Sequence, residues 1–193
     1  IDFEGEYSNQ LPAAVGGLAG TKVPGELKLT LPAIAEFSGS HQIDKKLGVH
    51  YSILWTGWDS FQKLEAYTPS QEAPVFSKEE NFSDSMRYSI GTDYQYSDAL
   101  LLRAGIAYDE SPADQSHLSI SIPDTDRFWF SFGGNYAFSE NSNIDLGVSI
   151  LRGKTQNFSE KDSLAASVGQ DVSWDYESKG HAVLVGAQYN YKF

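Results

Sequence analysis

The connections between strand-like segments alternate between long and short along the whole chain. Seven stretches show the two-residue alternation of apolar and polar side chains that is typical of β-strands. Short turns are expected at 44–46, 97–98 and 140–142, and long connections at 9–25, 68–84, 111–125 and 153–178. An up-and-down sandwich has no reason to sort its loops by length. An outer-membrane barrel does, because its periplasmic turns are short and its external loops are long.

The parity of the segments favours the same architecture. In the clearest one, Phe128, Phe130 and Phe132 alternate with Arg127 and Ser131. Such an apolar face would meet a core in a soluble sandwich but lipid in a barrel with a polar lumen. Aromatic side chains gather at the short-turn end, as in an interface girdle: Tyr94, Tyr96, Tyr136, Phe138, Tyr191 and Phe193. We expect an all-β, antiparallel up-and-down transmembrane β-barrel of outer-membrane type.

We expect the chain to supply seven to eight barrel strands. Residues 1–7 alternate and are interpreted as the end of an ascending strand, so the chain should continue upstream. Residues 27–43 form one expected strand, in which Pro32 indicates a bulge, an edge or a local break in the ladder. The strand from Leu47 is expected to extend through 61–67. Residues 1–193 are thus predicted to be a single β-barrel domain, the C-terminal part of a larger barrel.

Composition excludes several function classes. The net charge is −12 with 14 basic residues, so no basic face for nucleic acid is visible. There is no cysteine, and the four histidines show no metal-ligand spacing. No run approaches 18 apolar residues, which excludes a helical membrane span. We find no Ser-His-Asp arrangement, and expect a protein that is not an enzyme and holds neither cofactor nor metal.

Several segments resemble the FadL family of outer-membrane transporters for long-chain fatty acids and other hydrophobic compounds. The resemblance is collinear from about Leu31 to Phe193, and the run SISIPDTDRFW is its most specific part. The segments that carry it are LPAIAEFSG (31–39), HYSILWTGWDSFQKL (50–64), RYSIGTDYQYSD (87–98), RAGIAYDESP (103–112), SISIPDTDRFWFSFGGNYAF (119–138) and GHAVLVGAQYNYKF (180–193).

The resemblance implies a fourteen-stranded barrel with an N-terminal plug in the outer membrane of a Gram-negative bacterium. This chain would be the C-terminal half, without the plug and the early strands. The implied function is passive transport of hydrophobic ligands through the lumen. The implied partners are a long-chain fatty acid, outer-membrane lipid and lipopolysaccharide, and the barrel-assembly machinery through the last strand. Alternatives are a non-transporting barrel that anchors or scaffolds, a soluble lipid-binding barrel and an outer-membrane lipase.

Three residues are candidate ligand contacts. By resemblance, Lys78 matches a lysine that helps to hold the ligand head group, and an ammonium suits a carboxylate in a partly dry pocket. The alternative is a solvated loop lysine beside Glu79 and Glu80. Trp129 has lumen-facing parity and is the better candidate for a tunnel wall, whereas Trp55 has lipid-facing parity and suits an upper girdle.

The third candidate, Arg127, stands with Asp126 at the outer mouth of its strand. Arg127 could contact ligand, or bridge Asp109 across the ladder as one of a set of structural lumen charges. Arg87 and Arg103 are expected to face inward near Asp93 and Asp145, with the same structural pairing as the alternative.

Overall fold

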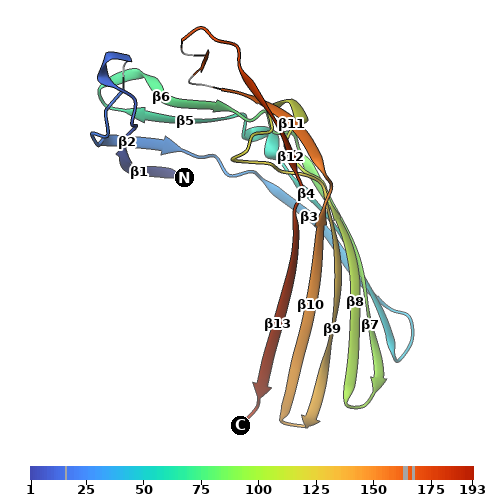
Figure 1. The fold of residues 1–193 in the computed structure, drawn as a ribbon. Coiled ribbons are helices and arrows are strands. Elements are labelled where there is room, and N and C mark those ends of the chain that lie inside the picture. Colours follow the sequence, from blue (N-terminus) through green and yellow to red (C-terminus); the bar gives the residue numbers. More distant parts are fainter. Residues whose placement is uncertain (16, 163–164, 167) are drawn as a thin grey trace.

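A computed structural model of the chain describes residues 1–15, 17–162, 165–166 and 168–193. These residues form three antiparallel sheets (Figure 1). In the described residues, no helix is long and apolar enough to cross a membrane. The largest sheet has the order β13-β10-β9-β8-β7-β4-β3. Its strands are β3 (Ile34–Gln42), β4 (Leu47–Thr56), β7 (Ser85–Ser97), β8 (Leu100–Asp109), β9 (Arg127–Ser139), β10 (Ser142–Gly153) and β13 (His181–Tyr191).

Two smaller sheets and three short 3-10 helices lie in the long connections at one end of this sheet (Figure 1). The four-stranded one, called the outer sheet below, has the order β1-β2-β5-β6, and β11 pairs with β12. Their bounds are β1 (Asp2–Tyr7), β2 (Val23–Lys28), β5 (Lys63–Thr68), β6 (Gln71–Glu79), β11 (Gln156–Lys161) and β12 (Ser173–Ser178), with η1 (Ala13–Val15), η2 (Trp58–Ser60) and η3 (Gln115–His117).

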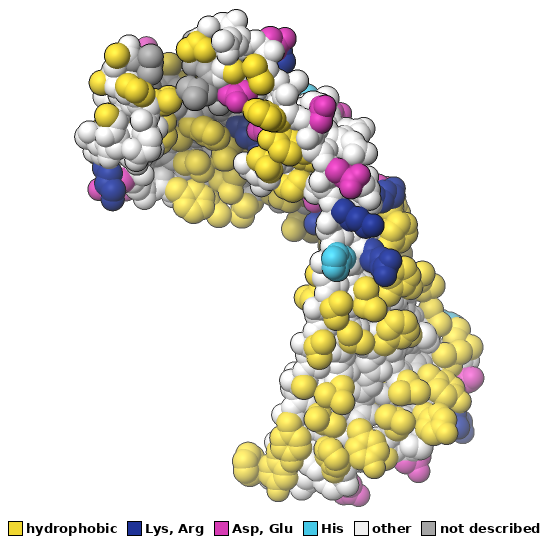
Figure 2. Space-filling model, viewed as in Figure 1, with side chains coloured by type: hydrophobic (Ala, Val, Ile, Leu, Met, Phe, Trp, Pro, Cys, Tyr) yellow, Lys and Arg dark blue, Asp and Glu magenta, His cyan; other side chains and the backbone are white. Residues whose placement is uncertain are grey.

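The register of the seven-stranded sheet places the apolar parity of its strands on one face. One row of residues across this face is Tyr51, Ile90, Ile106, Phe130, Ile150 and Val183. Phe130 and Ile106 are exposed, although both are apolar. Hydrophobic side chains also cover much of the visible outer surface of the sheet (Figure 2). An exposed apolar face of this extent is the lipid-facing surface of a barrel.

The height of the apolar face fits a membrane. Ten residue steps lead from Phe128 to Phe138 on β9. At about 3.3 Å per residue and a tilt of about 40°, they span roughly 25 Å along the membrane normal, which is the height of the apolar band of such barrels. The aromatic girdle predicted at the short-turn end is present, because Tyr136 and Phe138 on β9 lie near Tyr191 at the end of β13.

The three short turns are confirmed to within a residue or two, and they join β3 to β4, β7 to β8, and β9 to β10. Among the described residues the sheet is open, with β3 and β13 as its edges. An open sheet of seven strands is half of the fourteen-stranded barrel that the resemblance implies. From β3 to β13, the connections alternate between short and long, as expected.

Several expected elements were wrong in the long connections. Residues 1–7 are not an eighth barrel strand, because β1 pairs with β2 in the outer sheet. The break expected at Pro32 is present, but it is larger than expected, since 29–33 separate β2 from β3 and the two strands belong to different sheets. The strand from Leu47 ends at Thr56, and η2 redirects the chain into β5. The connections expected to be loops at 9–25, 68–84 and 153–178 contain β2, β6, β11 and β12.

Candidate functional site

The face of the seven-stranded sheet opposite the lipid is concave and carries small side chains. A hollow of about 1020 Å³ on this face is lined in part by five glycines, one from each of five strands: Gly91, Gly105, Gly133, Gly147 and Gly186. At Gly133 a Cβ atom would lie 2.7 Å from the carbonyl oxygen of Leu146, so the close approach of the backbones requires glycine there. The predicted spacious lumen wall is thus present.

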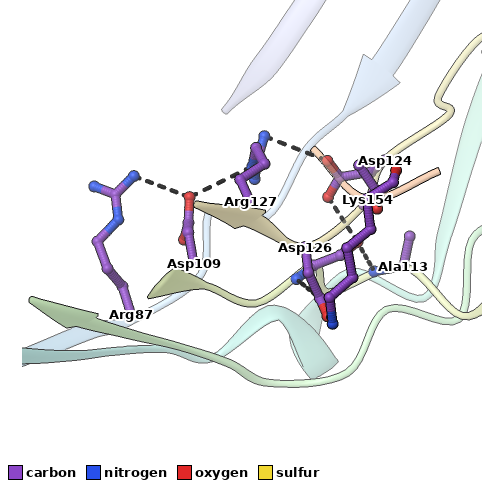
Figure 3. A network of polar contacts seen from close by, with 9 residues as sticks. Arg87, Asp109, Ala113, Asp124, Asp126, Arg127 and Lys154 are labelled. Atoms are coloured by element: carbon purple, nitrogen blue, oxygen red, sulfur yellow. Dashed lines mark hydrogen bonds and ion pairs between the residues drawn. The ribbon is translucent and has the colours of Figure 1, made fainter. Parts of the chain in front are cut away.

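A network of charges lies on the lumen side where β7, β8 and β9 approach the outer end (Figure 3). Asp109 accepts a hydrogen bond of 2.9 Å from Arg87 and lies 3.5 Å from Nε of Arg127. Arg127 also lies 3.3 Å from Asp124. The predicted bridge between Arg127 and Asp109 is confirmed, since the two residues are also partners in the strand ladder. Asp109 is thus shared by two guanidinium groups.

Asp126 is the centre of a second cluster, which Ser111 links to the first by contacting both Asp126 and Asp124. The carboxylate of Asp126 accepts hydrogen bonds from Lys154 (2.7 Å), Tyr108 (2.7 Å) and the amide of Ser111 (3.0 Å). Its partner Tyr108 has the parity opposite to Asp109 and packs against Phe128 on the lipid-facing side. Burial acts to raise the pKa of Asp126, but these hydrogen bonds outweigh burial and leave the pKa below its ordinary value. The hydrogen bonds of Lys154 to Asp126 and Tyr108 raise the pKa of Lys154. Both groups are therefore charged at neutral pH.

Trp129 lies on the lumen side, as its parity predicted. It lines a hollow of about 610 Å³ together with small residues of neighbouring strands. The guanidinium carbon of Arg87 lies 5.4 Å from the centre of the Trp129 ring, which is within the range of a cation–π contact. Its Nε1 is buried without a hydrogen-bond partner in the described part of the chain. An indole so placed can contact a ligand that moves along the wall.

Of the other two lumen arginines, Arg103 pairs as expected and Arg87 does not. Arg103 donates to Asp145 at 3.1 Å, as expected. Arg87 does not lie near Asp93, because the two residues are six positions apart on β7 and Arg87 pairs across the ladder with Asp109. Asp93 instead forms a short contact with Nε2 of His50 on β4. Arg87, Arg103, Asp93 and Asp145 thus each have a partner.

Lys78 is not a loop residue, because it lies in β6 opposite Leu64 of β5. Its ammonium group lies 2.9 Å from Oε1 of Glu80, which is only 1% exposed. It also donates a hydrogen bond of 2.5 Å to Oγ of the buried Ser119. The alternative of a solvated loop lysine is therefore wrong as far as location and partners are concerned.

The connection from β8 to β9 joins Lys78 to the charge network. It supplies Ser119 to Lys78, and Asp124 and Asp126 to Arg127 and Lys154. This is the segment in which the run SISIPDTDRFW stands, so its polar residues have defined contacts at both ends. Leu118, which directly precedes the run, is buried. The run is therefore the structural link between the outer sheet and the barrel wall.

Sequence reasoning missed Glu80 and Ser119 as partners of Lys78. Glu80 was grouped with Glu79 as part of a solvated run of charges. The available signal was parity, because Phe76, Lys78 and Glu80 occupy alternate positions and so share one side of an extended chain. For Ser119 the sequence holds no such signal, since the contact with Lys78 spans 41 residues.

Comparison with known proteins places the chain in a family. The family model described as "Outer membrane protein transport protein (OMPP1/FadL/TodX)" matches residues 1–193. The whole chain is 42% identical to the "47 kDa outer membrane protein" of Pasteurella multocida and 38% identical to the "Long-chain fatty acid transport protein" of Escherichia coli. It covers 44% and 42% of these two proteins, respectively.

A solved structure shares the fold. The FadL homologue of Pseudomonas aeruginosa superimposes with a TM-score of 0.85 at 23% identity, over 98% of this chain and 46% of that one. The chain therefore spans a little under half the length of the proteins it matches. Its sheet is part of a β-barrel of the bacterial outer membrane, and the chain crosses that membrane several times. The chain belongs to the OMPP1/FadL/TodX family of outer membrane transport proteins.

Proposed function

We propose that the barrel containing this chain carries hydrophobic molecules passively across the outer membrane, with long-chain fatty acids as the preferred class. The relatives named as long-chain fatty acid transport proteins support this choice. The observation that carries the proposal is the position of Lys78 at the end of an apolar face. A fatty acid needs such an arrangement, because its tail is apolar and its head group is an anion.

The outer sheet is amphipathic. A row across one face joins four apolar side chains from its four strands: Phe3, Leu27, Ala66 and Phe76. The opposite face carries Glu4, Glu26 and Glu65. Phe3 and Phe76 remain about half exposed, although this sheet lies beyond the apolar band of the barrel. Apolar area left open to water on one face of a sheet is typical of a ligand-binding surface.

Lys78 continues this apolar face, because it follows Phe76 on the same parity of β6. An ammonium group has three N–H donors. Glu80 and Ser119 contact the ammonium group of Lys78, which leaves one N–H donor for a ligand. The side chain of Lys78 is 22% exposed, so a ligand can reach this donor. A carboxylate there would receive a charge-assisted hydrogen bond, while its tail covers Phe76 and its neighbours.

The test compares a fatty acid with the fatty alcohol of equal length in the intact barrel protein. We expect Lys78→Met to weaken binding of the acid by roughly 1.5–3 kcal/mol, the range for a hydrogen bond to a charged group. The alcohol should lose much less, because burial of the tail contributes equally in both ligands at about 0.8 kcal/mol per methylene.

Two further variants separate the ligand effect from local damage. Lys78→Met leaves the buried Glu80 without its cation, so Lys78→Met combined with Glu80→Gln removes both charges. Lys63→Met is the matched control, because Lys63 lies on the neighbouring strand and pairs with Glu65. Equal losses for acid and alcohol in the double variant, or a loss in Lys63→Met, would contradict the role of Lys78.

Trp129 and Arg127 are proposed to contact the ligand below Lys78, on the wall of the lumen. The alternative of a barrel that only anchors or scaffolds has no use for an apolar outer face with a cation at its end. The predicted single domain over residues 1–193 and the contact of the last strand with the barrel-assembly machinery stay predictions.

A further inference from the structure

Arg152 breaks the pattern of the lipid-facing side. On β10 it shares the parity of Ile150, Val148 and Leu146, all of which belong to the apolar face. Arg152 is exposed, and it has neither an ion-pair nor a hydrogen-bond partner in the described residues. A charged side chain on the lipid face is destabilising near the bilayer centre and costs little at the interface. The level of Arg152 in the membrane therefore decides how to interpret it.

The strand ladder gives that level. Arg152 lies opposite Phe128 on β9 and His181 on β13, and Phe128 lies opposite Tyr108 on β8. The next row toward the short turns contains Phe130 and Ile150, and all its members are apolar except Tyr51 at one end. The row of Arg152 is the first beyond it. It therefore lies at the edge of the apolar band, at the end of the sheet that carries the long connections. Basic side chains and a histidine gather at this edge in Figure 2.

A second free cation lies beside Arg152. Lys179 precedes Gly180, whose carbonyl oxygen accepts a hydrogen bond of 2.9 Å from the amide of Gly153. The two chain segments are thus still adjacent at this point, and Lys179 is exposed without a partner in the described residues. Lys154 is nearby, but Asp126 already neutralises its charge. Arg152, Lys179 and His181 form what we call the outer basic patch.

We propose that the outer basic patch binds a phosphate group of lipopolysaccharide in the outer leaflet. Side chains directly opposite on paired strands have Cβ atoms about 5 Å apart, so Arg152 and His181 can both donate to one anion. Arginine in particular presents a fork of N–H groups that fits a phosphate. The acyl chains of the same lipid would lie on the apolar row below, against Ile150 and Val183.

Charge and position select this ligand. The chain as a whole carries a net charge of −12, so general attraction to anionic lipid is not expected and a local site is required. The long connections mark the external side of an outer-membrane barrel. The lipid of that leaflet is lipopolysaccharide, whose phosphates stand directly above its acyl chains. The proposal is independent of which molecule the barrel transports.

The experiment measures lipopolysaccharide bound to the intact barrel protein by native mass spectrometry after titration in detergent. The double variant Arg152→Gln with Lys179→Gln should bind roughly tenfold more weakly or worse, since each cation near an anionic lipid surface contributes to binding. Lys45→Gln with Lys46→Gln removes the same charge in the short turn at the opposite end and should bind like the wild type. Lipopolysaccharide stripped of its phosphates should bind the wild type no better than the double variant binds the intact lipid.

Three results would overturn the proposal. The first is equal affinity of the double variant and the wild type while both fold, as judged by heat-modifiable migration in gel electrophoresis. The second is equal binding of phosphate-free lipopolysaccharide, because the phosphate would then contribute nothing. The third is binding of phosphatidylglycerol vesicles as strong as that of lipopolysaccharide, which would indicate a surface for anionic lipid in general.

Discussion

The seven-stranded sheet and the outer sheet use the same two-residue alternation in different solvents. Phe130 in β9 and Phe76 in β6 are exposed to nearly the same extent, 39% and 43%, yet the first lies in the lipid band and the second beyond it. Strand pairing separates the two cases, because β9 lies between two barrel strands whereas β6 pairs with β5 in the outer sheet. The barrel strands have 9 to 13 residues and β6 has nine, but the other outer strands, β1, β2 and β5, have only six. Six residues rise only about 20 Å even without tilt, so they cannot cross the band.

The largest effect should come from placing a charge on the lipid-facing side of the barrel. Phe132→Arg should lower the free energy of unfolding by about 2–4 kcal/mol, because Phe132 lies near the middle of the band. Its neighbour Ser131 faces the lumen hollow, so Ser131→Arg is the matched control and should cost much less. Urea unfolding of the protein in lipid vesicles gives both values. Equal costs would mean that the two faces do not differ in solvent.

The next effect concerns the charge network that joins the barrel to its outer part. Asp109→Asn should destabilise the protein by about 1–3 kcal/mol, because it removes the shared acceptor of Arg87 and Arg127. Asp145→Asn is the control, since its pair with Arg103 is more exposed and holds one guanidinium group only. The same unfolding experiment applies. A larger loss for Asp145→Asn would show that sharing of Asp109 has no energetic weight.

These two predictions also mark how far the sequence alone could reach. The lipid and lumen faces followed from parity, because a one-residue shift in register would move Phe132 to the wrong side. The pairing of Arg127 with Asp109 followed from the same ladder. The outer sheet could not be found this way, since β1 is as well patterned as a barrel strand and only its length and its partner β2 distinguish it. Contacts such as Lys78 with Ser119 depend on how long connections fold over one another, which periodicity does not encode.

A smaller effect should appear as pH dependence at the outer end of the barrel. The pKa of Asp126 is lowered, so its contribution to stability is complete above its ordinary value of 3.8 and is lost as pH falls through the lower folded value. The pKa of Lys154 is raised, so its contribution is complete below 10.5 and is lost as pH rises through the higher folded value.

Asp126→Asn should therefore flatten the acid limb of the unfolding free energy plotted against pH. At neutral pH it should lower the free energy of unfolding by less than Asp109→Asn does. Asp114 is the control position, because its pKa is also lowered but its main partner is Ser116 within the same loop. If Asp114→Asn removes as much of the acid limb, the acid dependence does not report the Asp126 network.

The smallest effect on stability should come from Phe76, and it tests the comparison most directly. Phe76→Ser should leave the free energy of barrel unfolding unchanged, because in the described part of the chain β6 pairs with β5 alone and with no strand of the seven-stranded sheet. Phe130→Ser, at nearly equal exposure, should cost about 2 kcal/mol, since a phenyl ring leaves contact with hydrocarbon. Ligand binding should show the reverse order: Phe76→Ser weakens binding of both fatty acid and fatty alcohol, because the apolar face is common to both tails, whereas Phe130→Ser affects neither. If Phe76→Ser destabilises the barrel as much as Phe130→Ser does, the outer sheet and the barrel unfold as one unit and exposure alone sets the cost.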